Sequence, residues 1–295
     1  MNTTNRREFV FSSLATLGTA ATCGTALGKT GPKAKMPTVK WGRHEISRLL
    51  VGHNPLKGQS YTNGTLDKEM RAWYDPKQGH DVELLVRCRE AGINTCQVGG
   101  GNMEDVLRRF YAKGGTMQWI STFYARPGQG GNELKRILKM DPKPIGAQQW
   151  GQVSDDLLAA GKLDQVTENL KLLRDSGLLV GLGAHNPRVI EYAEEKGFDV
   201  DFYQCCFYYT RHGEMWNDKE RQRMVEVMRR ASKPCIGFKV LAGNHLTKTP
   251  QDVYDALQFA FDHIKPTDVV LVGIWQKSKD QVEENARSVA KILHA

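Results

Sequence analysis

Short apolar runs that alternate with amphipathic helical segments limit the fold of this sequence more than any other feature. Eight runs have the length and composition of buried strands, at 46–52, 93–98, 117–124, 144–150, 178–184, 200–207, 235–243 and 268–274. Helical periods follow them, at 80–91, 104–113, 132–139, 163–176, 188–196, 219–231, 250–264 and 279–293. Continuous apolar runs are typical of parallel strands covered on both faces. The sequence therefore predicts a single α/β domain over residues 38–295, a (β/α)8 TIM barrel.

A doubly wound open sheet is the alternative fold for such an alternation. It is disfavoured because no glycine-rich dinucleotide-binding fingerprint follows the first predicted strand. The polar stretch 57–79 is long for a connection, so we expect a functional or lid-like loop there.

The N-terminal residues 1–28 have the pattern of an export signal rather than of a folded segment. Arg6 and Arg7 precede a mildly apolar stretch, residues 12–27, which is typical of a twin-arginine signal. That stretch is too short and too weakly apolar for a stable membrane span. We expect cleavage near residues 26–28, use of the twin-arginine translocase and a periplasmic or exported location. Lipid attachment at Cys23 is the less favoured alternative.

Composition excludes some classes of function and some kinds of site. The formal net charge is +8, but the basic residues are scattered among acidic ones, so a nucleic-acid partner is not expected. The six cysteines show no CxxC spacing, which argues against a zinc or redox motif. We expect buried free thiols, and a disulfide in an oxidising compartment is the alternative.

Polar residues at the predicted strand ends indicate where a ligand binds. The C-terminal ends of barrel strands form the active-site mouth. We expect His185 and Lys239 to be catalytic there, since histidine titrates near neutrality and a desolvated lysine can act as acid, base or imine former. Structural roles, a turn for His185 and an anion anchor for Lys239, remain alternatives. His53 and His185 lack a third ligand, so no metal is expected.

Amide and aromatic side chains dominate the remaining strand ends, which suits a neutral sugar or polyol. Satisfying buried backbone groups is the alternative role for any one of them. The predicted substrate-binding residues are His53, Asn54, Gln97, Gln149, Trp150 and Asn186.

Several segments resemble the aldo-keto reductases. They are Trp41-Gly42-Arg43 through Val51-Gly52, Ala91 to Asn94, Gly181 to Ala193, Phe238 to Gly243, and Val272-Gly273 running to Gln281-Val282-Glu283-Glu284-Asn285. The resemblance implies a TIM barrel and an NADP(H)-dependent oxidoreductase acting on a carbonyl or polyol substrate. It also implies that the cofactor phosphate and adenine bind after the last strand, at Lys277, Ser278, Gln281 and Asn285. A plain helix cap formed by Ser278 and Gln281 is the alternative.

The family's catalytic tetrad is missing from the matching positions. Where the family has aspartate, tyrosine, lysine and histidine, this sequence has Gln97, Asn102, Phe123 and Gln149. Three hypotheses follow: an exported oxidoreductase with a rearranged site, a catalytically degenerate barrel that binds a small molecule, and a cofactor-independent lyase or isomerase that uses Lys239.

Overall fold

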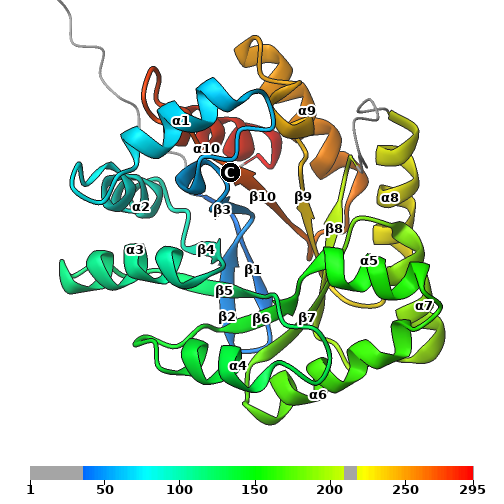
Figure 1. The fold of residues 1–295 in the computed structure, drawn as a ribbon. Helices are drawn as coiled ribbons and strands as arrows, with labels where there is room; N and C mark the ends of the chain where they lie inside the picture. Colours follow the sequence, from blue (N-terminus) through cyan, green and yellow to red (C-terminus); the bar gives the residue numbers. More distant parts are fainter. Residues whose placement is uncertain (1–35, 209–217, 295) are drawn as a thin grey trace, which may run out of the picture. The chain divides into compact units, whose positions relative to one another are not determined.

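The computed structural model describes residues 36–208 and 218–294. Eight parallel strands close a barrel in the order β10-β3-β4-β5-β6-β7-β8-β9, surrounded by helices (Figure 1). This closed barrel confirms the predicted TIM-barrel fold. The barrel strands are β3 Leu49–Gly52, β4 Thr95–Val98, β5 Gln118–Phe123, β6 Gly146–Gln149, β7 Leu179–Ala184, β8 Phe202–Cys206, β9 Cys235–Phe238 and β10 Val269–Gly273.

The helices follow the strands in the order that the sequence pattern predicts. Their bounds are α1 Gly64–Trp73, α2 His80–Glu90, α3 Gly101–Ala112, α4 Gly131–Leu138, α5 Gly151–Ala159, α6 Val166–Asp175, α7 Pro187–Lys196, α8 Asp218–Arg230, α9 Pro250–His263 and α10 Gln281–Ile292. Short 3-10 turns are η1 Pro55–Lys57, η2 Leu163–Gln165 and η3 Ala242–Asn244.

The prediction of one continuous strand over 46–52 is wrong. Residues before Arg48 belong to an antiparallel hairpin of β1 Thr38–Trp41 and β2 His44–Ser47, and the first barrel strand begins only at Leu49. The hairpin covers the end where the barrel strands begin, because the side-chain amides of Asn94 and Gln118 donate to the Glu45 carbonyl. We call this end of the barrel the lower end.

The stretch 57–79, which we expected to be a functional or lid-like loop, contains a helix. It contains α1, which begins after Asn63, whose side chain accepts a hydrogen bond from Leu66 N. Met70 is the one buried residue of α1, so the apolar periodicity that marks a core-facing helix is absent from the sequence. The sequence prediction also missed α5.

The lower half of the barrel interior is an apolar cluster that includes side chains of the hairpin. Its members are Trp41, Ile46, Leu50, Ile120, Phe202, Ile236, Val269 and Leu271. Trp41 packs on Phe202 with ring centroids 5.3 Å apart, and its Nε1 donates to Thr267 O at 2.9 Å. A Cβ atom at Gly181 would lie 2.3 Å from the Phe202 ring, so close packing requires glycine there.

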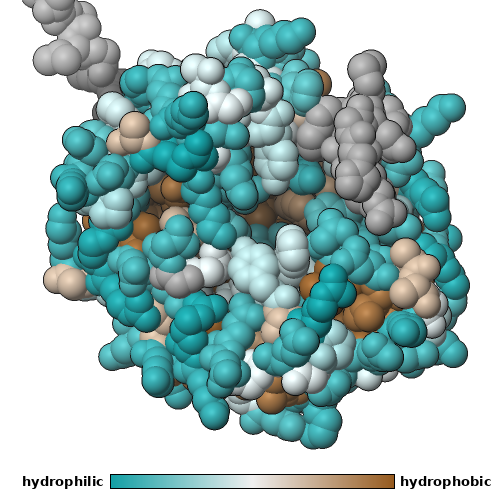
Figure 2. Space-filling view, in the orientation of Figure 1, coloured by the Kyte–Doolittle hydropathy of each residue, from teal (hydrophilic) through white to brown (hydrophobic). Residues whose placement is uncertain are grey.

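The predicted export signal, residues 1–28, lies outside the described residues. None of the described helices combines the length and apolar character that a membrane span requires. The face of the molecule in Figure 2 is covered mainly by hydrophilic side chains, and apolar atoms show there only in separate small areas.

Candidate functional site

The upper half of the barrel interior is polar, in contrast to the lower half. The inward-facing positions next above the apolar cluster hold four buried side chains, Gln97 on β4, Thr122 on β5, Gln148 on β6 and Gln204 on β8. Gln97 Nε2 donates to Gln204 Oε1 at 2.6 Å, and Gln204 Nε2 donates to Gln97 Oε1 at 2.9 Å. Gln148 Oε1 is buried without a hydrogen-bond partner among the described residues.

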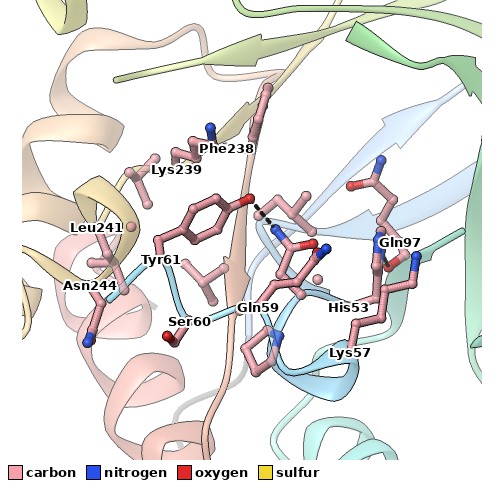
Figure 3. A pocket seen from close by; sticks show the side chains of 18 of the residues that line it. His53, Lys57, Gln59, Ser60, Tyr61, Gln97, Phe238, Lys239, Leu241 and Asn244 are labelled. Carbon is pink, nitrogen blue, oxygen red and sulfur yellow. Dashed lines mark hydrogen bonds between the residues drawn. The ribbon is translucent and has the colours of Figure 1, made fainter. Parts of the chain in front are cut away.

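These four side chains form the floor of a cleft of about 680 Å³. The cleft extends from Gln97 and Gln148 at the barrel axis to Gln281 and Asn285 in α10. A volume of this size accommodates a cofactor or a drug-sized ligand. Eight of the predicted site residues line it, namely His53, Asn54, Gln97, Trp150, His185, Lys239, Gln281 and Asn285. Figure 3 shows three of them, His53, Gln97 and Lys239.

His185, after β7, forms a pair with Asp155 of α5. The Asp155 carboxylate lies 2.8 Å from His185 Nδ1 and also accepts hydrogen bonds from the backbone N–H groups of His185 and Asn186. The two side chains are 15% and 5% exposed. Since a carboxylate accepts hydrogen bonds, Nδ1 carries the proton and Nε2 is the basic nitrogen of the ring. This pair can exchange a proton with a ligand in the cleft.

His53, after β3, is the second histidine of the cleft and has a different environment. Its Nδ1 lies 3.1 Å from the backbone carbonyl oxygen of Gln97, which can only accept, so the proton is on Nδ1. Burial, and next the positive charge of Lys57, lower the pKa of His53 to about 4. His53 is therefore neutral near pH 7, and its Nε2 is a hydrogen-bond acceptor.

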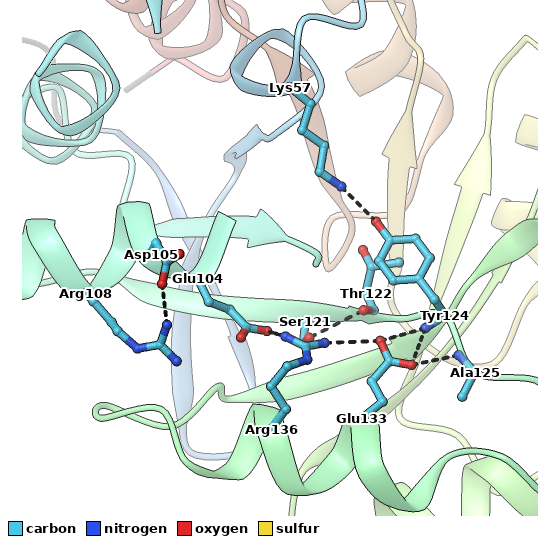
Figure 4. Close-up of polar contacts among 10 residues, drawn as sticks. All are labelled: Lys57, Glu104, Asp105, Arg108, Ser121, Thr122, Tyr124, Ala125, Glu133 and Arg136. Atoms are coloured by element: carbon cyan, nitrogen blue, oxygen red, sulfur yellow. Dashed lines mark hydrogen bonds and ion pairs between the residues drawn. The ribbon is translucent and has the colours of Figure 1, made fainter. Parts of the chain in front are cut away.

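Lys57 and Tyr124 form a polar pair on the same side of the cleft (Figure 4). Lys57 Nζ donates to the Tyr124 hydroxyl at 3.4 Å. Burial lowers the pKa of Lys57, and burial with the nearby charge of Glu133 raises the pKa of Tyr124 to about 12. The Tyr124 hydroxyl is thus protonated near pH 7 and can donate a hydrogen bond. The Glu133 carboxylate accepts from the backbone N–H groups of Tyr124 and Ala125, which fixes Tyr124 in place.

Lys239 lies in a strained turn directly after β9. Its φ is 56°, and Asn244 in the same loop has a φ of 82°, a region that L-residues rarely adopt. Lys239 Nζ lies 5.0 Å from the centroid of the Tyr61 ring, whose hydroxyl accepts from Asn54 Nδ2 at 2.8 Å (Figure 3). Asn244 Nδ2 donates to Thr62 Oγ1 at 3.0 Å. The loop after β9 therefore contacts the segment before α1 beside the cleft.

The first turn of α10 is capped by side chains of this chain. The N-cap is Asp280, whose carboxylate accepts from Glu283 N, so the alternative of a cap formed by Ser278 and Gln281 is wrong in its residues. Gln281 Oε1 instead accepts from Trp275 N at 2.8 Å. Lys279 lines the cleft, with its Nζ 3.6 Å from a Glu284 carboxylate oxygen.

Two of the predicted cofactor-binding residues do not line the cleft. Lys277 is paired with Glu69 of α1 on the surface, and Ser278 is also outside the cleft lining. The basic residue near α10 that can reach a ligand in the cleft is therefore Lys279.

Two of the predicted substrate-binding residues have structural roles instead. Gln149 is fully buried, with its Nε2 donating to the carbonyls of Phe123 and Ala125 and its Oε1 accepting from Asn169. Because strand side chains alternate, the inward-facing residues are Thr122 and Gln148, one position before Phe123 and Gln149.

Asn186 caps α7 by accepting from Arg188 N.

The described cysteines, Cys88, Cys96, Cys205, Cys206 and Cys235, are free and buried, as predicted. Burial raises the pKa of the Cys206 thiol to about 12. Within residues 36–208 and 218–294, no three histidine, cysteine or acidic side chains are grouped so as to hold a metal ion.

Several residues that line or support the cleft could not be identified from the sequence. Asp155, which holds His185, belongs to the missed helix α5, and Lys57 lies in the stretch predicted to be a loop. Gln148 and Gln204 are inward-facing strand positions, which only the strand register distinguishes from their neighbours. The sequence signal available for Gln148 and Gln204 was the presence of a polar glutamine near the end of an otherwise apolar predicted strand.

The chain matches no protein-family model and no curated protein sequence. Its fold matches a glycerol dehydrogenase from Gluconobacter oxydans with a TM-score of 0.57 and 13% identity, over 87% of this chain and 94% of that chain. A thermostable aldo-keto reductase in complex with the inhibitor epalrestat gives a TM-score of 0.52 at 16% identity, over 88% and 95%.

An archaeal fructose-1,6-bisphosphate aldolase also matches, with a TM-score of 0.50 and 11% identity over 84% of this chain and 94% of that chain. In that structure the catalytic lysine is covalently bound to the carbinolamine intermediate of the substrate. At these identities the comparisons establish the fold, a TIM barrel like that of the aldo-keto reductases.

Proposed function

We propose that this protein is an exported, NADP(H)-dependent oxidoreductase that interconverts a hydroxyl and a carbonyl group on a small sugar-like or polyol substrate. The observation that carries the proposal is the cleft, which brings His185, held by Asp155 behind it, and the first turn of α10 into one cavity. A hydroxyl–carbonyl interconversion needs a group that exchanges a proton, and this pair provides it.

The residues at the α10 end of the cleft fit a phosphorylated dinucleotide. Lys279 offers a positive charge, and the amide side chain of Asn285, which is 3% exposed, lines the same cavity. Nearer the barrel axis, the Phe238 ring forms part of the wall and the Gln97–Gln204 amides form the floor. When bound, NADP(H) would supply the hydride acceptor or donor.

The protein's own contribution is proton transfer and positioning. His185 Nε2 takes the hydroxyl proton when the substrate is oxidised and returns it when a carbonyl is reduced. Asp155 orients the ring through Nδ1 and stabilises the imidazolium that forms during the transfer. Asp155 is fixed in turn by two backbone N–H groups.

Titration of the full-length protein with NADPH tests the cofactor. Trp150 and Trp275 line the cleft, so NADPH should quench the tryptophan fluorescence. Lys279→Ala should weaken NADPH binding by about tenfold, the loss of one charge-assisted contact. The matched control is Lys277→Ala, two residues away on the surface, which should bind as wild type does. If NADPH changes neither fluorescence nor melting temperature at millimolar concentration, the oxidoreductase proposal is wrong.

His185→Asn tests the proton transfer. Asparagine keeps an N–H group that can reach Asp155 but has no basic nitrogen. Turnover of a polyol with NADP⁺ should fall by about 10²–10⁴-fold, with an unchanged melting temperature and NADPH affinity. A variant that binds NADPH and turns over at the wild-type rate would remove His185 from the reaction. NADPH binding with no turnover of any polyol or carbonyl would favour the degenerate binding barrel.

Lys239 supports a second candidate, a cofactor-independent lyase or isomerase. Its amine lies in the cleft on a strained backbone, where it could condense with a substrate carbonyl to an imine and release water. Borohydride reduction in the presence of a keto or aldo sugar, followed by mass spectrometry, would detect a covalent adduct on Lys239. Absence of an adduct with ketoses and aldoses would exclude this candidate.

Export is tested separately from the site. Replacing both Arg6 and Arg7 by lysine should leave the protein in the cytoplasm if the twin-arginine pathway exports it. Unchanged recovery from the periplasm would contradict the proposed location.

A further inference from the structure

Lys57 places a positive charge inside the cleft, and no acidic side chain within residues 36–208 and 218–294 forms an ion pair with it. Its ammonium is half-buried, contacts the Tyr124 hydroxyl and has no carboxylate partner among the described residues. A desolvated, unpaired charge is unfavourable, and an anionic ligand would compensate it. Lys279, by contrast, has Glu284 within 3.6 Å.

The acidic residue near Tyr124 is already engaged elsewhere. Both Glu133 carboxylate oxygens accept hydrogen bonds from the backbone N–H of Tyr124, and one also accepts from Ala125 N. Arg136 lies 3.4 Å from the same carboxylate and also pairs with Glu104 (Figure 4). Glu133 is thereby held by partners of its own, away from Lys57.

The glycines after β4 leave space around Lys57 and Tyr124. A Cβ atom at Gly99 would lie 2.6 Å from the Tyr124 hydroxyl, so any side chain there would displace this group. Gly100 has a φ of 85°, and its Cβ would lie 3.5 Å from Lys57 Nζ. The glycine pair thus keeps side chains away from the two donors.

A hydrogen-bond acceptor lines the cleft together with these donors. His53 Nε2 is unprotonated near pH 7, because Nδ1 carries the proton and the ring is neutral. The amide side chains of Gln97, Gln148 and Gln204 line the same cleft. One acceptor, the amides and one cation are complementary to a ligand that carries hydroxyl groups and an anionic group.

We propose that the substrate of this cleft is a polyhydroxylated acid, with its carboxylate or phosphate group bound by Lys57 Nζ and the Tyr124 hydroxyl. A hydroxyl group of the same molecule donates to His53 Nε2, and other hydroxyl groups contact the amide side chains of the cleft floor. The reaction assigned to this substrate rests on the proposed oxidoreductase function, whereas its binding does not.

Calorimetry with three open-chain six-carbon probes tests the proposal on the full-length protein. D-glucitol is neutral, D-gluconate replaces one end by a carboxylate, and D-glucitol 6-phosphate carries a phosphate. We expect at least one anion to bind about tenfold or more tightly than D-glucitol, with added salt weakening the anion alone. The anion that binds more tightly shows whether the natural ligand carries a carboxylate or a phosphate. Equal affinity for all three probes, or no anion binding at millimolar concentration, would overturn the proposal.

Variants assign the charge preference to Lys57. Lys57→Met should abolish the difference between anionic and neutral probes, and Lys57→Arg should retain most of it. Lys68→Met is the matched control, since Lys68 is an exposed lysine on α1 and should bind as wild type does. Retention of the preference in a folded Lys57→Met protein would refute the role of Lys57.

NADPH titration of the same variants separates the two proposals. Lys57→Met should bind NADPH with wild-type affinity, because the cofactor is assigned to Lys279 and Asn285 and not to Lys57. Loss of anion preference with NADPH binding intact supports both proposals. Anion preference without NADPH binding in the wild-type protein would refute the cofactor but leave the anion subsite standing.

Discussion

The lower and upper halves of the barrel interior are built by the same strands with opposite chemistry. On β8, Phe202 faces inward in the apolar cluster, and Gln204, two residues later, faces inward in the polar floor of the cleft. On β5, Ile120 and Thr122 show the same change. Side chains two apart on a strand share a face, so the change reflects depth in the barrel and not orientation.

Along each strand, the lower part therefore contributes to stability and the upper part to ligand binding. The hairpin residues Trp41 and Ile46 complete the packing of the lower half, which excludes water and ligands. The upper half contains the Gln97–Gln204 pair and the buried Gln148 side chain, beside the His185–Asp155 pair. In TIM barrels, residues at the C-terminal strand ends generally serve function and those at the N-terminal ends serve stability.

Phe202→Ala should have the largest effect on stability. Removing a fully buried ring from the lower cluster leaves a cavity beneath Trp41, and such substitutions lower the free energy of unfolding by about 3–5 kcal/mol. Urea unfolding measures the loss. Ligand affinity per folded molecule should stay at the wild-type value, because the ring does not line the cleft.

Phe202→Leu is the matched control, which retains most of the buried volume and should lose less stability. If Phe202→Ala reduced the free energy of ligand binding to the folded protein by more than it reduced the free energy of unfolding, the two halves would not have separate roles.

The amide pair of the upper half should show a smaller effect with strong coupling. Gln204→Leu leaves the buried amide of Gln97 without its two mutual hydrogen bonds, which costs about 1–3 kcal/mol. The double variant Gln97→Leu, Gln204→Leu should be closer to wild type in stability than the sum of the two single variants. Its ligand binding should nevertheless be lost, because the polar floor is removed. Additive stability losses would show that the two amides act independently.

The sequence predicted the barrel well because its evidence is local. Apolar runs and helical periods mark the strands and most helices without knowledge of any long-range contact. Helix α1 was not predicted because it buries only Met70. Strands β1 and β2 were not predicted because they are short and pair only with each other.

The site was harder to predict because it depends on register and on distant contacts. Gln148 and Gln149 are neighbours on one strand, but Gln148 lines the cleft whereas Gln149 is hydrogen-bonded to Asn169 outside the barrel. An error of one residue in register therefore exchanges their roles. Asp155 reaches His185 across 30 positions of sequence, and Lys57 reaches Tyr124 across 67. Such pairs are set by tertiary structure, which no local pattern encodes.

The pH dependence of stability tests His53 in the upper half. Its pKa is about 4 in the folded protein, lowered from the usual 6.5 by burial first and then by Lys57. Between these two pH values the unfolded chain binds a proton that the folded protein does not, so stability falls as the pH drops from about 6.5 toward about 4. Above that window the contribution of His53 is constant. His53→Asn should flatten this part of the curve of unfolding free energy against pH, measured by urea titration at several pH values. If the wild type and His53→Asn gave parallel curves through the window, His53 would not be the neutral acceptor that the upper half of the barrel requires.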